Sequence, residues 1–411
     1  MFRLAFNYAK YVVLLLTFCS LHACSGNPNS PSVQDAASTG SVQQQFSDYN
    51  TNPAAPDKTG MSSTARELAS RIRIGLNKGN TLEAVGNQGE KSWGNPAITA
   101  DFIALAKKSG FNAIRLPVSW DQYADQSTAA IDPAWQNRIK QVVQYCIDND
   151  LYVLVNIHWD GGWLERNVTP EKQQQVNARQ KAYWQQIATL LRDFDERLIF
   201  ASANEPHAEN AEQMAVLLSY HQTFIDTVRA TGGKNSYRTL VVQGPSTDIE
   251  KTRNWMHQLP EDPTKDRMML ELHYYSPYNF TLMADDASWG KAAYYWGKDF
   301  MSDNDSERNA STDEDYVDQM FSSVKKQFVD AGIPVILGEF GADIRGKLTG
   351  DERTRHLNSR AHYFNYVTKS AIAHGLVPFY WDTGSLLDRR QNKVLDQQAL
   401  NALMSGSSAF K

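Results

Sequence analysis

Eight short apolar runs recur between residues 72 and 380, and each has the length and composition of a buried strand. They are Ile72–Leu76, Ala113–Leu116, Tyr152–Ile157, Leu198–Ala203, Leu240–Gln243, Met268–Leu272, Val335–Leu337 and Val377–Tyr380. Amphipathic segments lie between them, at Asp101–Ser109, Trp135–Asn149, Lys172–Phe194, Glu212–Thr231 and Glu314–Ala331. Continuous apolar strands that alternate with helices are typical of a parallel sheet covered by helices on both faces.

Eight such units predict the α/β class and favour a single (β/α)8 (TIM) barrel over residues 64–411, where the composition shows no break. A doubly wound open sheet is the main alternative. Its nucleotide-binding version is disfavoured because no GxGxxG or GxxxxGK[ST] loop follows any strand. The long connection after the sixth strand, about 274–332, is rich in aromatic residues. It is too aromatic for disorder, so we expect this insertion to form a wall over the active cleft.

The first 63 residues have a different composition. Residues 1–23 combine basic Arg3 and Lys10 with an apolar stretch too short to span a bilayer, which predicts a lipoprotein-type export signal. Leu21-His22-Ala23-Cys24 resembles a bacterial lipobox, so we expect lipidation at Cys24 and attachment to the outer membrane. An ordinary signal peptide and a secreted protein are the alternative. Residues 24–63 are poor in large aliphatic side chains and predict a flexible polar linker.

Charge argues against one class of partner, and cysteine content argues against disulfides. The formal net charge is −5, and no Lys/Arg-rich run appears, which argues against nucleic acid. After the export signal, Cys24 and Cys146 remain, and with Cys24 lipidated no disulfide can form, so stability must come from core burial. No two histidines share helical spacing with an acid, so we expect no metal site and no cofactor. We expect a monomer.

Polar and aromatic residues follow six of the eight predicted strands at the same end. Arg115 lies in the second strand, His158 follows the third, and Asn204-Glu205-Pro206 follows the fourth. The remaining residues are His273 and Tyr275 after the sixth strand, Glu339 after the seventh and Trp381 after the eighth. The carboxyl ends of barrel strands form the catalytic face. Two glutamates aimed into one cleft there, Glu205 and Glu339, predict glycoside hydrolysis.

These motifs resemble glycoside hydrolase family 5, the cellulase-type retaining β-glycanases, over residues 66 to 400. The segments Gly75–Ala84, Ser92–Pro96 and Gly110–Trp120 are similar to its endoglucanase and xyloglucanase branch. The chain departs from the family pattern at Leu76, Lys78 and Trp159, which leaves the substrate preference open.

The resemblance implies that Glu205 is the general acid/base and Glu339 the nucleophile of a retaining reaction, for which the carboxyls should lie about 5–5.5 Å apart. We expect a high pKa for Glu205 and an ionised Glu339. Arg115 and Tyr275 would hold Glu339 as a carboxylate. Asn204 would bind the sugar 2-hydroxyl.

His158 and His273 would orient substrate hydroxyls and the catalytic carboxyls. Trp381 would form a sugar platform beside the nucleophile, because the C–H face of a pyranose packs on an indole. Candidates for flanking subsites are Trp93, Trp163, Trp159, Trp289 and Trp296.

The predicted function is therefore a retaining endo-β-1,4-glucanase that hydrolyses cellulose-like, mixed-linkage or xyloglucan chains. A β-mannanase or glucomannanase on the same frame is the nearest alternative. A non-catalytic surface glycan-binding lipoprotein is the alternative from another class, and the presence of both acids in intact motifs argues against it.

Overall fold

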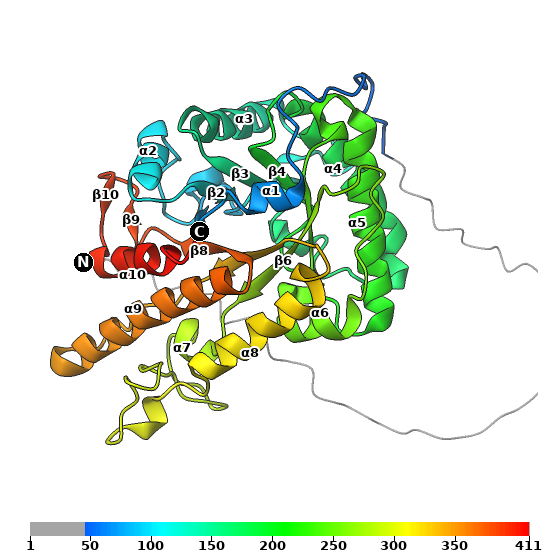
Figure 1. Cartoon of the computed structure of the whole chain (residues 1–411). Helices are drawn as coiled ribbons and strands as arrows, with labels where there is room; N and C mark the ends of the chain where they lie inside the picture. Colours follow the sequence, from blue (N-terminus) through cyan, green and yellow to red (C-terminus); the bar gives the residue numbers. More distant parts are fainter. Residues whose placement is uncertain (1–45, 411) are drawn as a thin grey trace, which may run out of the picture. The chain divides into compact units, whose positions relative to one another are not determined.

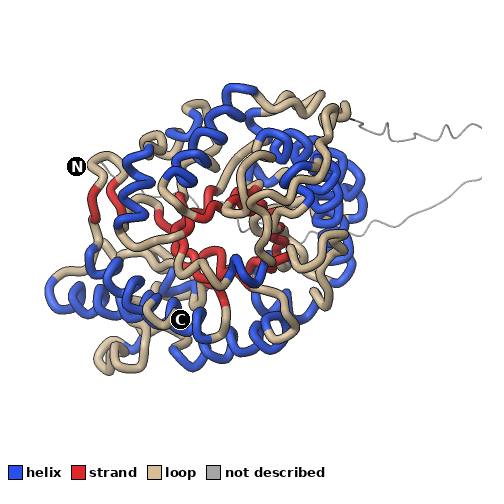
Figure 2. The backbone as a smooth tube through the Cα atoms, turned by 45° about the horizontal axis from the view of Figure 1, so that its top comes forward, coloured by secondary structure: helices blue, strands red, loops and turns tan. Residues whose placement is uncertain are grey.

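The computed structural model describes residues 46–410. Eight parallel strands pair in sequence order, and β8 pairs with β1, so the sheet closes on itself (Figures 1 and 2). The strands are β1 (Gly75–Lys78), β2 (Ala113–Leu116), β3 (Tyr152–Asn156), β4 (Leu198–Ala201), β5 (Leu240–Gln243), β6 (Met268–Tyr274), β7 (Val335–Phe340) and β8 (Leu376–Asp382). The predicted (β/α)8 barrel is confirmed.

Helices surround the ring of strands (Figure 2). They are α1 (Ala65–Ala69), α2 (Ala100–Lys108), α3 (Pro133–Asp148), α4 (Pro170–Leu190), α5 (Ala211–Thr231), α6 (Ile249–Trp255), α7 (Tyr278–Thr281), α8 (Glu314–Val324), α9 (Gly350–Ala373) and α10 (Gln397–Ser407). A π-helical turn, Lys325–Val329, continues α8. A small antiparallel pair, β9 (Leu387–Asp388) and β10 (Lys393–Val394), follows β8.

Several helices begin where the sequence supplies a cap. Thr99 accepts a hydrogen bond from the Phe102 N–H at the start of α2, and Asn210 accepts one from the Gln213 N–H at the start of α5. Such side chains satisfy N–H groups that have no partner inside the helix.

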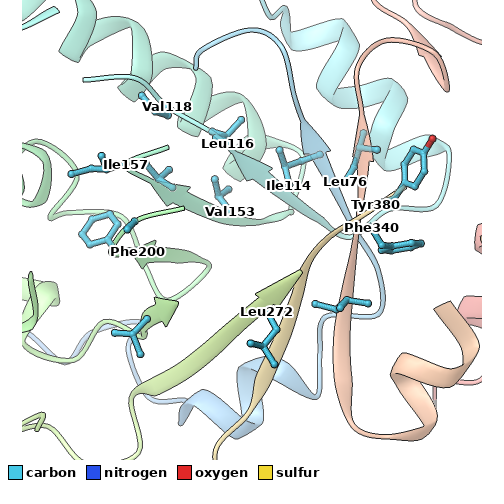
Figure 3. Packing of buried hydrophobic residues seen from close by; sticks show 14 of the residues in the cluster. Leu76, Ile114, Leu116, Val118, Val153, Ile157, Phe200, Leu272, Phe340 and Tyr380 are labelled. Carbon is cyan, nitrogen blue, oxygen red and sulfur yellow. The ribbon is translucent and has the colours of Figure 1, made fainter. Parts of the chain in front are cut away.

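Side chains alternate along each strand between the barrel interior and the helix layer. In β2, Ile114 and Leu116 pack outward, and Ala113 packs inward. The outward set forms the main core under the helices, which includes Val153, Phe200 and Leu272 (Figure 3). Toward the carboxyl ends of the strands, the inward positions become polar. The alternation therefore places a polar layer at one mouth of an otherwise apolar barrel.

The opposite mouth is closed by α1. Leu68 of α1 and Ile72 after it pack with inward residues of the barrel such as Leu154, Val241 and Ile336. This apolar plug leaves the carboxyl-end mouth as the place for chemistry, as in other barrels of this type.

Helix α9 was not among the predicted helices. Its first turns bury His356, Ser359 and Arg360, and apolar Tyr363 and Phe364 are buried only after them. Arg360 donates to the Ala342 carbonyl and pairs with Asp396. Polar residues on the buried face interrupt the apolar spacing by which a helix is recognised.

The predicted flexible linker, residues 24–63, does not extend to residue 63. Within its described part, Phe46 and Tyr49 pack on the core, and Met61 is fully buried. Lys234 pairs with Asp57 at 2.8 Å. A few well-spaced apolar anchors are enough to fix a segment that is polar on average. Cys24, the export signal and residues 24–45 lie outside the described residues. Between residues 46 and 410, no helix has the length and apolar character needed to cross a membrane.

The insertion between β6 and α8 contributes buried side chains to the main core, in addition to any wall over the cleft. Trp296 is fully buried and packs edge-on against Tyr363 of α9, with ring centroids 5.0 Å apart. Phe280 is also fully buried and packs on the same tyrosine. The expectation is therefore incomplete, because half of the aromatic side chains of the insertion attach it to α9. They are Phe280, Tyr295, Trp296 and Phe300.

Candidate active site

The polar layer at the carboxyl-end mouth joins residues from all eight strands or the loops that follow them. Arg115 on β2 is its centre and is fully buried. Its Nη1 donates to Oε1 of Glu339 at 2.8 Å and to Oδ1 of Asn77 at 2.9 Å, and its Nη2 donates to Oδ1 of Asn204 at 2.8 Å. A fourth partner is Glu271, whose Oε1 forms an ion pair with Arg115 Nε at 2.8 Å, out of line for a hydrogen bond. One guanidinium therefore positions four side chains.

Glu339 is held from two sides. Arg115 binds one carboxylate oxygen, and the Tyr275 hydroxyl donates to the other at 3.0 Å. The Glu339 residue is only 5 % exposed. A fixed carboxylate with both oxygens engaged is suited to in-line attack at a single position.

Glu205 lies opposite and is more accessible, with 39 % of its side chain exposed. His273 Nδ1 lies 2.7 Å from its Oε1, and His273 Nε2 lies 3.3 Å from Oε1 of Glu271. His273 Nδ1 is also 3.8 Å from Oε2 of Glu339. The imidazole thus lies between the two carboxyl groups that the sequence singled out.

The spacing of these groups limits the chemistry. One carboxylate oxygen of Glu205, one of Glu339 and a ring nitrogen of His273 all lie within 4.8 Å of one another. Carboxyl groups at about 5–5.5 Å suit retaining hydrolysis, whereas inversion needs a wider gap that admits a water. The pair has the short spacing.

Glu205, His273 and Glu339 carry the kinds of atom that also bind metal ions. The 2.7 Å contact between His273 and Glu205 is a hydrogen-bond distance. Two ligands of a tetrahedral ion with bonds of about 2.0 Å lie roughly 3.3 Å apart. The geometry fits a shared proton better than an ion, and the absence of a metal requirement stays a prediction.

The pKa values follow from this cluster. Burial lowers the pKa of His273, but Glu339, Glu205 and Glu271 outweigh it and raise the pKa to about 10. Burial raises the pKa of Glu205, but the hydrogen bond and charge of His273, with Arg115, bring it below its ordinary value. The pKa of Glu339 is raised, chiefly by burial. We expected the reverse for both glutamates. The proton that His273 holds lowers the pKa of Glu205, whereas burial outweighs the charges of His273 and Arg115 at Glu339.

His158 and Trp381 form one side of the mouth. Their rings stack at 5.7 Å between centroids and 11° between planes. Asn156 Nδ2 lies 3.2 Å from His158 Nδ1, and Asn156 Oδ1 accepts from the Val118 N–H. The amide is therefore oriented as a donor to His158, which leaves the proton of the neutral ring on Nε2. Burial lowers the pKa of His158 well below its usual range.

Sequence reasoning missed four residues that complete the site: Asn77, Glu165, Gln243 and Glu271. Glu271 is fully buried, and Gln243 donates to it at 2.6 Å. A usable signal existed for Glu271, since Glu271 and His273 are two residues apart on β6 and are expected to face the same side. Gly338 leaves space for the side chain of Glu271, because a Cβ at residue 338 would lie 2.1 Å from Glu271 Oε1.

The flanking tryptophans are less closely tied to the carboxyls. Trp163 donates its indole N–H to Asp160 at 3.3 Å and packs edge-on against Tyr183. Trp93 is half-buried in the loop between β1 and α2. Their contact with substrate stays a prediction, whereas the buried Trp296 is excluded as a surface subsite.

Two of the departures from the family pattern lie outside the cleft. Leu76 belongs to the outward core, and Lys78 Nζ lies 4.4 Å from the centroid of the Phe102 ring on α2. Of the three positions, only Trp159 remains a candidate for setting substrate choice. It is half-buried in the loop after β3.

Comparison with known proteins agrees with this geometry. Residues 76–386 match the family model for cellulase, glycosyl hydrolase family 5. A xyloglucan-specific endo-β-1,4-glucanase of Bacteroides ovatus is 38 % identical over 371 residues, 86 % of this chain and 72 % of that protein. Endoglucanase A of Paenibacillus barcinonensis is 35 % identical over 393 residues, 88 % of this chain and 94 % of its own length.

Solved structures give the same result. A family 5 xyloglucanase of Bacteroides ovatus, in complex with a XXXG heptasaccharide, has a TM-score of 0.81 at 35 % identity and covers 89 % of this chain and 81 % of its own. A family 5 xyloglucanase of Paenibacillus pabuli with bound ligand has a TM-score of 0.75 at 35 % identity, over 83 % and 99 % of the two chains. The matched family region contains every residue of the polar layer, from Asn77 to Trp381. The chain belongs to glycosyl hydrolase family 5, the cellulase family.

Proposed function

We propose that this glycoside hydrolase cuts β-1,4-glucan backbones internally, with retention of configuration, and that xyloglucan is its preferred polymer. The observation that carries the reaction type is the short spacing of Glu205 and Glu339 around His273. The polymer is suggested by the relatives, several of which are described as xyloglucanases.

Each carboxyl has one role in the proposed mechanism. Glu339 attacks the anomeric carbon, the bond to the leaving oxygen breaks, and Glu205 gives that oxygen a proton. Water then attacks the same carbon, gives its proton to Glu205 and releases Glu339 as the carboxylate. The arrangement fits these roles because Glu339 is fixed by Arg115 and Tyr275, whereas the more exposed Glu205 can reach the leaving group.

The lowered pKa of Glu205 is compatible with its role as the acid. His273 and Glu205 share a 2.7 Å hydrogen bond, and near neutral pH the pair holds one proton. As the leaving oxygen gains negative charge, that proton passes from His273 to Glu205 and on to the oxygen. Tight contact makes such a transfer direct.

Release of reducing ends by the purified protein tests the proposal. The substrates are xyloglucan, mixed-linkage glucan, carboxymethylcellulose and glucomannan, with Glu205→Gln and Glu339→Gln as inactive variants. Exposed Glu307→Gln is the matched control and should behave as the wild type. We expect the highest kcat/KM on xyloglucan and β-anomers as the first products by NMR.

Three results would contradict parts of the proposal. A preference for glucomannan would favour the mannanase alternative, and α-anomers as first products would exclude retention. No release from any of the four polymers would favour the glycan-binding alternative.

We further propose that the protein is exported and attached to the outer membrane through lipid on Cys24, on the strength of the Leu21–Cys24 sequence. In a bacterial host, the full chain should fractionate with the outer membrane, and Cys24→Ser should be lost from that fraction. Equal outer-membrane association of the two would contradict lipid attachment.

A further inference from the structure

An exposed apolar surface marks the insertion after β6. Among residues 46–410, five large apolar side chains are exposed, and four of them belong to the insertion or to the loop after β7. They are Tyr278 (51 % exposed), Leu282 (39 %), Trp289 (66 %) and Ile344 (37 %). Scattered single exposures need no explanation, but this set is concentrated in two neighbouring loops. The fifth residue, Leu395, belongs to neither.

Trp289 lies at the tip of a tight hairpin. The N–H of Ala287 donates to the Gly290 carbonyl at 3.0 Å, and the Gly290 N–H donates to the Ala287 carbonyl at 3.2 Å. Turn tips usually carry small polar residues or glycine. A tryptophan there is held out into solvent, and its ring lies 6.0 Å from that of Tyr278, tilted by 41°. We name these two rings the Tyr278–Trp289 platform.

The frame under the platform is fixed. Arg345, which is 5 % exposed, donates to the backbone carbonyls of Asn279, Phe280, Met283 and Ala293. A buried cation that satisfies four carbonyls locks the loop around it, because release of any one would leave a buried polar group unpaired. The platform is therefore presented rigidly and loses little freedom when it binds.

The charged side chains around the platform are largely neutralised. Asp286 pairs with Arg308, which also lies over the ring of Tyr294, and Asp285 pairs with Lys347. The surface thus offers aromatic faces to an uncharged ligand rather than a charged patch to an ionic one. Apolar C–H faces of sugar rings are ligands of this kind.

The platform lies close to the catalytic carboxyls along the chain. Tyr275 donates to Glu339, and three residues of chain span at most about 11 Å, which limits the distance to Tyr278. Thr281 joins the two loops, since its hydroxyl donates to the Tyr275 carbonyl at 2.6 Å and its own carbonyl accepts from the Asp343 N–H at 2.9 Å. Figure 1 shows the insertion projecting beyond α7 and α8 at the lower left.

We propose that the Tyr278–Trp289 platform is a distal contact site for the polysaccharide chain, outside the catalytic centre, where pyranose faces pack on the two rings. This inference rests on the proposed function. It assigns the insertion a role in holding polymers, while short oligosaccharides that end before the platform do not use it.

Kinetics on long and short substrates test the platform. The full chain carrying Trp289→Ala, Tyr278→Ala or both is compared on xyloglucan and on an aryl cellobioside. We expect the ratio of kcat/KM for polymer to kcat/KM for the short substrate to fall about tenfold in the double variant, through KM. Leu395→Ala, which removes an equally exposed apolar side chain elsewhere, should leave the ratio unchanged.

The outcomes separate this inference from the function on which it rests. A wild type inactive on every polymer would overturn the proposed function. An active wild type, with the same ratio in the double variant as in Leu395→Ala, would overturn the platform alone. A change of oligomeric state by light scattering in the double variant, with an unchanged ratio, would assign the rings to a second copy and would also overturn it.

Discussion

The backbone N–H of Glu205 donates a hydrogen bond to the side chain of Glu165, with 2.7 Å between the nitrogen and Oε1. Two residues further on, the N–H of His207 donates to the backbone carbonyl of Glu165 at 2.9 Å. The loop after β3 thereby holds the loop that carries Glu205. Burial, and after it the charge of Glu205, raises the pKa of Glu165 to about 7.

Glu165→Gln should change the pH dependence of catalysis. Ionised Glu165 opposes the loss of the proton from the Glu205–His273 pair, so its removal lets that proton leave at lower pH. We expect the alkaline limb of kcat/KM to move down by roughly half to one pH unit. Exposed Glu212→Gln on α5 is the control. A lowered melting temperature with an unmoved limb would mean that Glu165 acts only through structure.

Glu205→Ala and Glu339→Ala should respond differently to the leaving group if the two glutamates have the proposed roles. Glu205→Ala removes only proton transfer, so we expect polymer hydrolysis to fall by about 10²–10⁴-fold while an activated aryl cellobioside still forms the glycosyl-enzyme. Added azide should then give a β-glycosyl azide. Glu339→Ala should give the α-glycosyl azide, because azide attacks where the carboxylate is missing. The opposite pair of products, determined by NMR, would exchange the two roles.

Gly79→Ala should displace Trp381, the residue predicted to pack on a sugar ring. A Cβ at Gly79 would lie 2.6 Å from Cζ2 of Trp381, so this half-buried indole would have to shift. We expect kcat/KM on polymer to fall about tenfold, equivalent to about 1.4 kcal/mol, with a smaller change in the free energy of unfolding. Gly346→Ala, with nothing within 4 Å of its Cβ, is the matched control. Wild-type kinetics in Gly79→Ala would show that the position of Trp381 does not matter.

His356 should make stability depend on acid pH. Its Nε2 accepts the Arg345 N–H at 3.0 Å, and burial lowers its pKa to about 4. Because the folded pKa lies below the unfolded value of about 6.5, this contribution is complete above pH 6.5 and is lost as pH falls toward 4. It amounts to about 3 kcal/mol at most.

Denaturant unfolding between pH 4 and 7 checks this sign. His356 Nδ1 also lies 2.8 Å from the Tyr294 carbonyl. Glutamine can keep both hydrogen bonds without titrating, so His356→Gln should flatten the pH dependence of the free energy of unfolding. Exposed His257→Gln should keep the wild-type slope. Equal slopes in all three proteins would exclude His356 as the source.

Local patterns in the sequence were sufficient to locate the strands of the barrel. Each predicted strand overlaps an observed one, and the predicted runs at β2 and β5 have the observed bounds. The errors in the predicted bounds lie mainly at the polar ends of the strands. β7 continues through Glu339 and β8 through Asp382, beyond the apolar residues from which these strands were predicted. At the mouth of a barrel, the strand geometry persists after the apolar pattern has ended.

Short-range patterns in the sequence were enough to predict the buried strands and the carboxyl ends where Glu205 and Glu339 lie. The closed strand order needed the tertiary structure, as did the position of His273 between the two acids and the parts played by Glu165 and Glu271 in the site. The tertiary structure also decided that Trp296 is core whereas Trp289 is surface. These outcomes depend on contacts between residues far apart in the chain, and the charges and burial that set each pKa exist only when those contacts form.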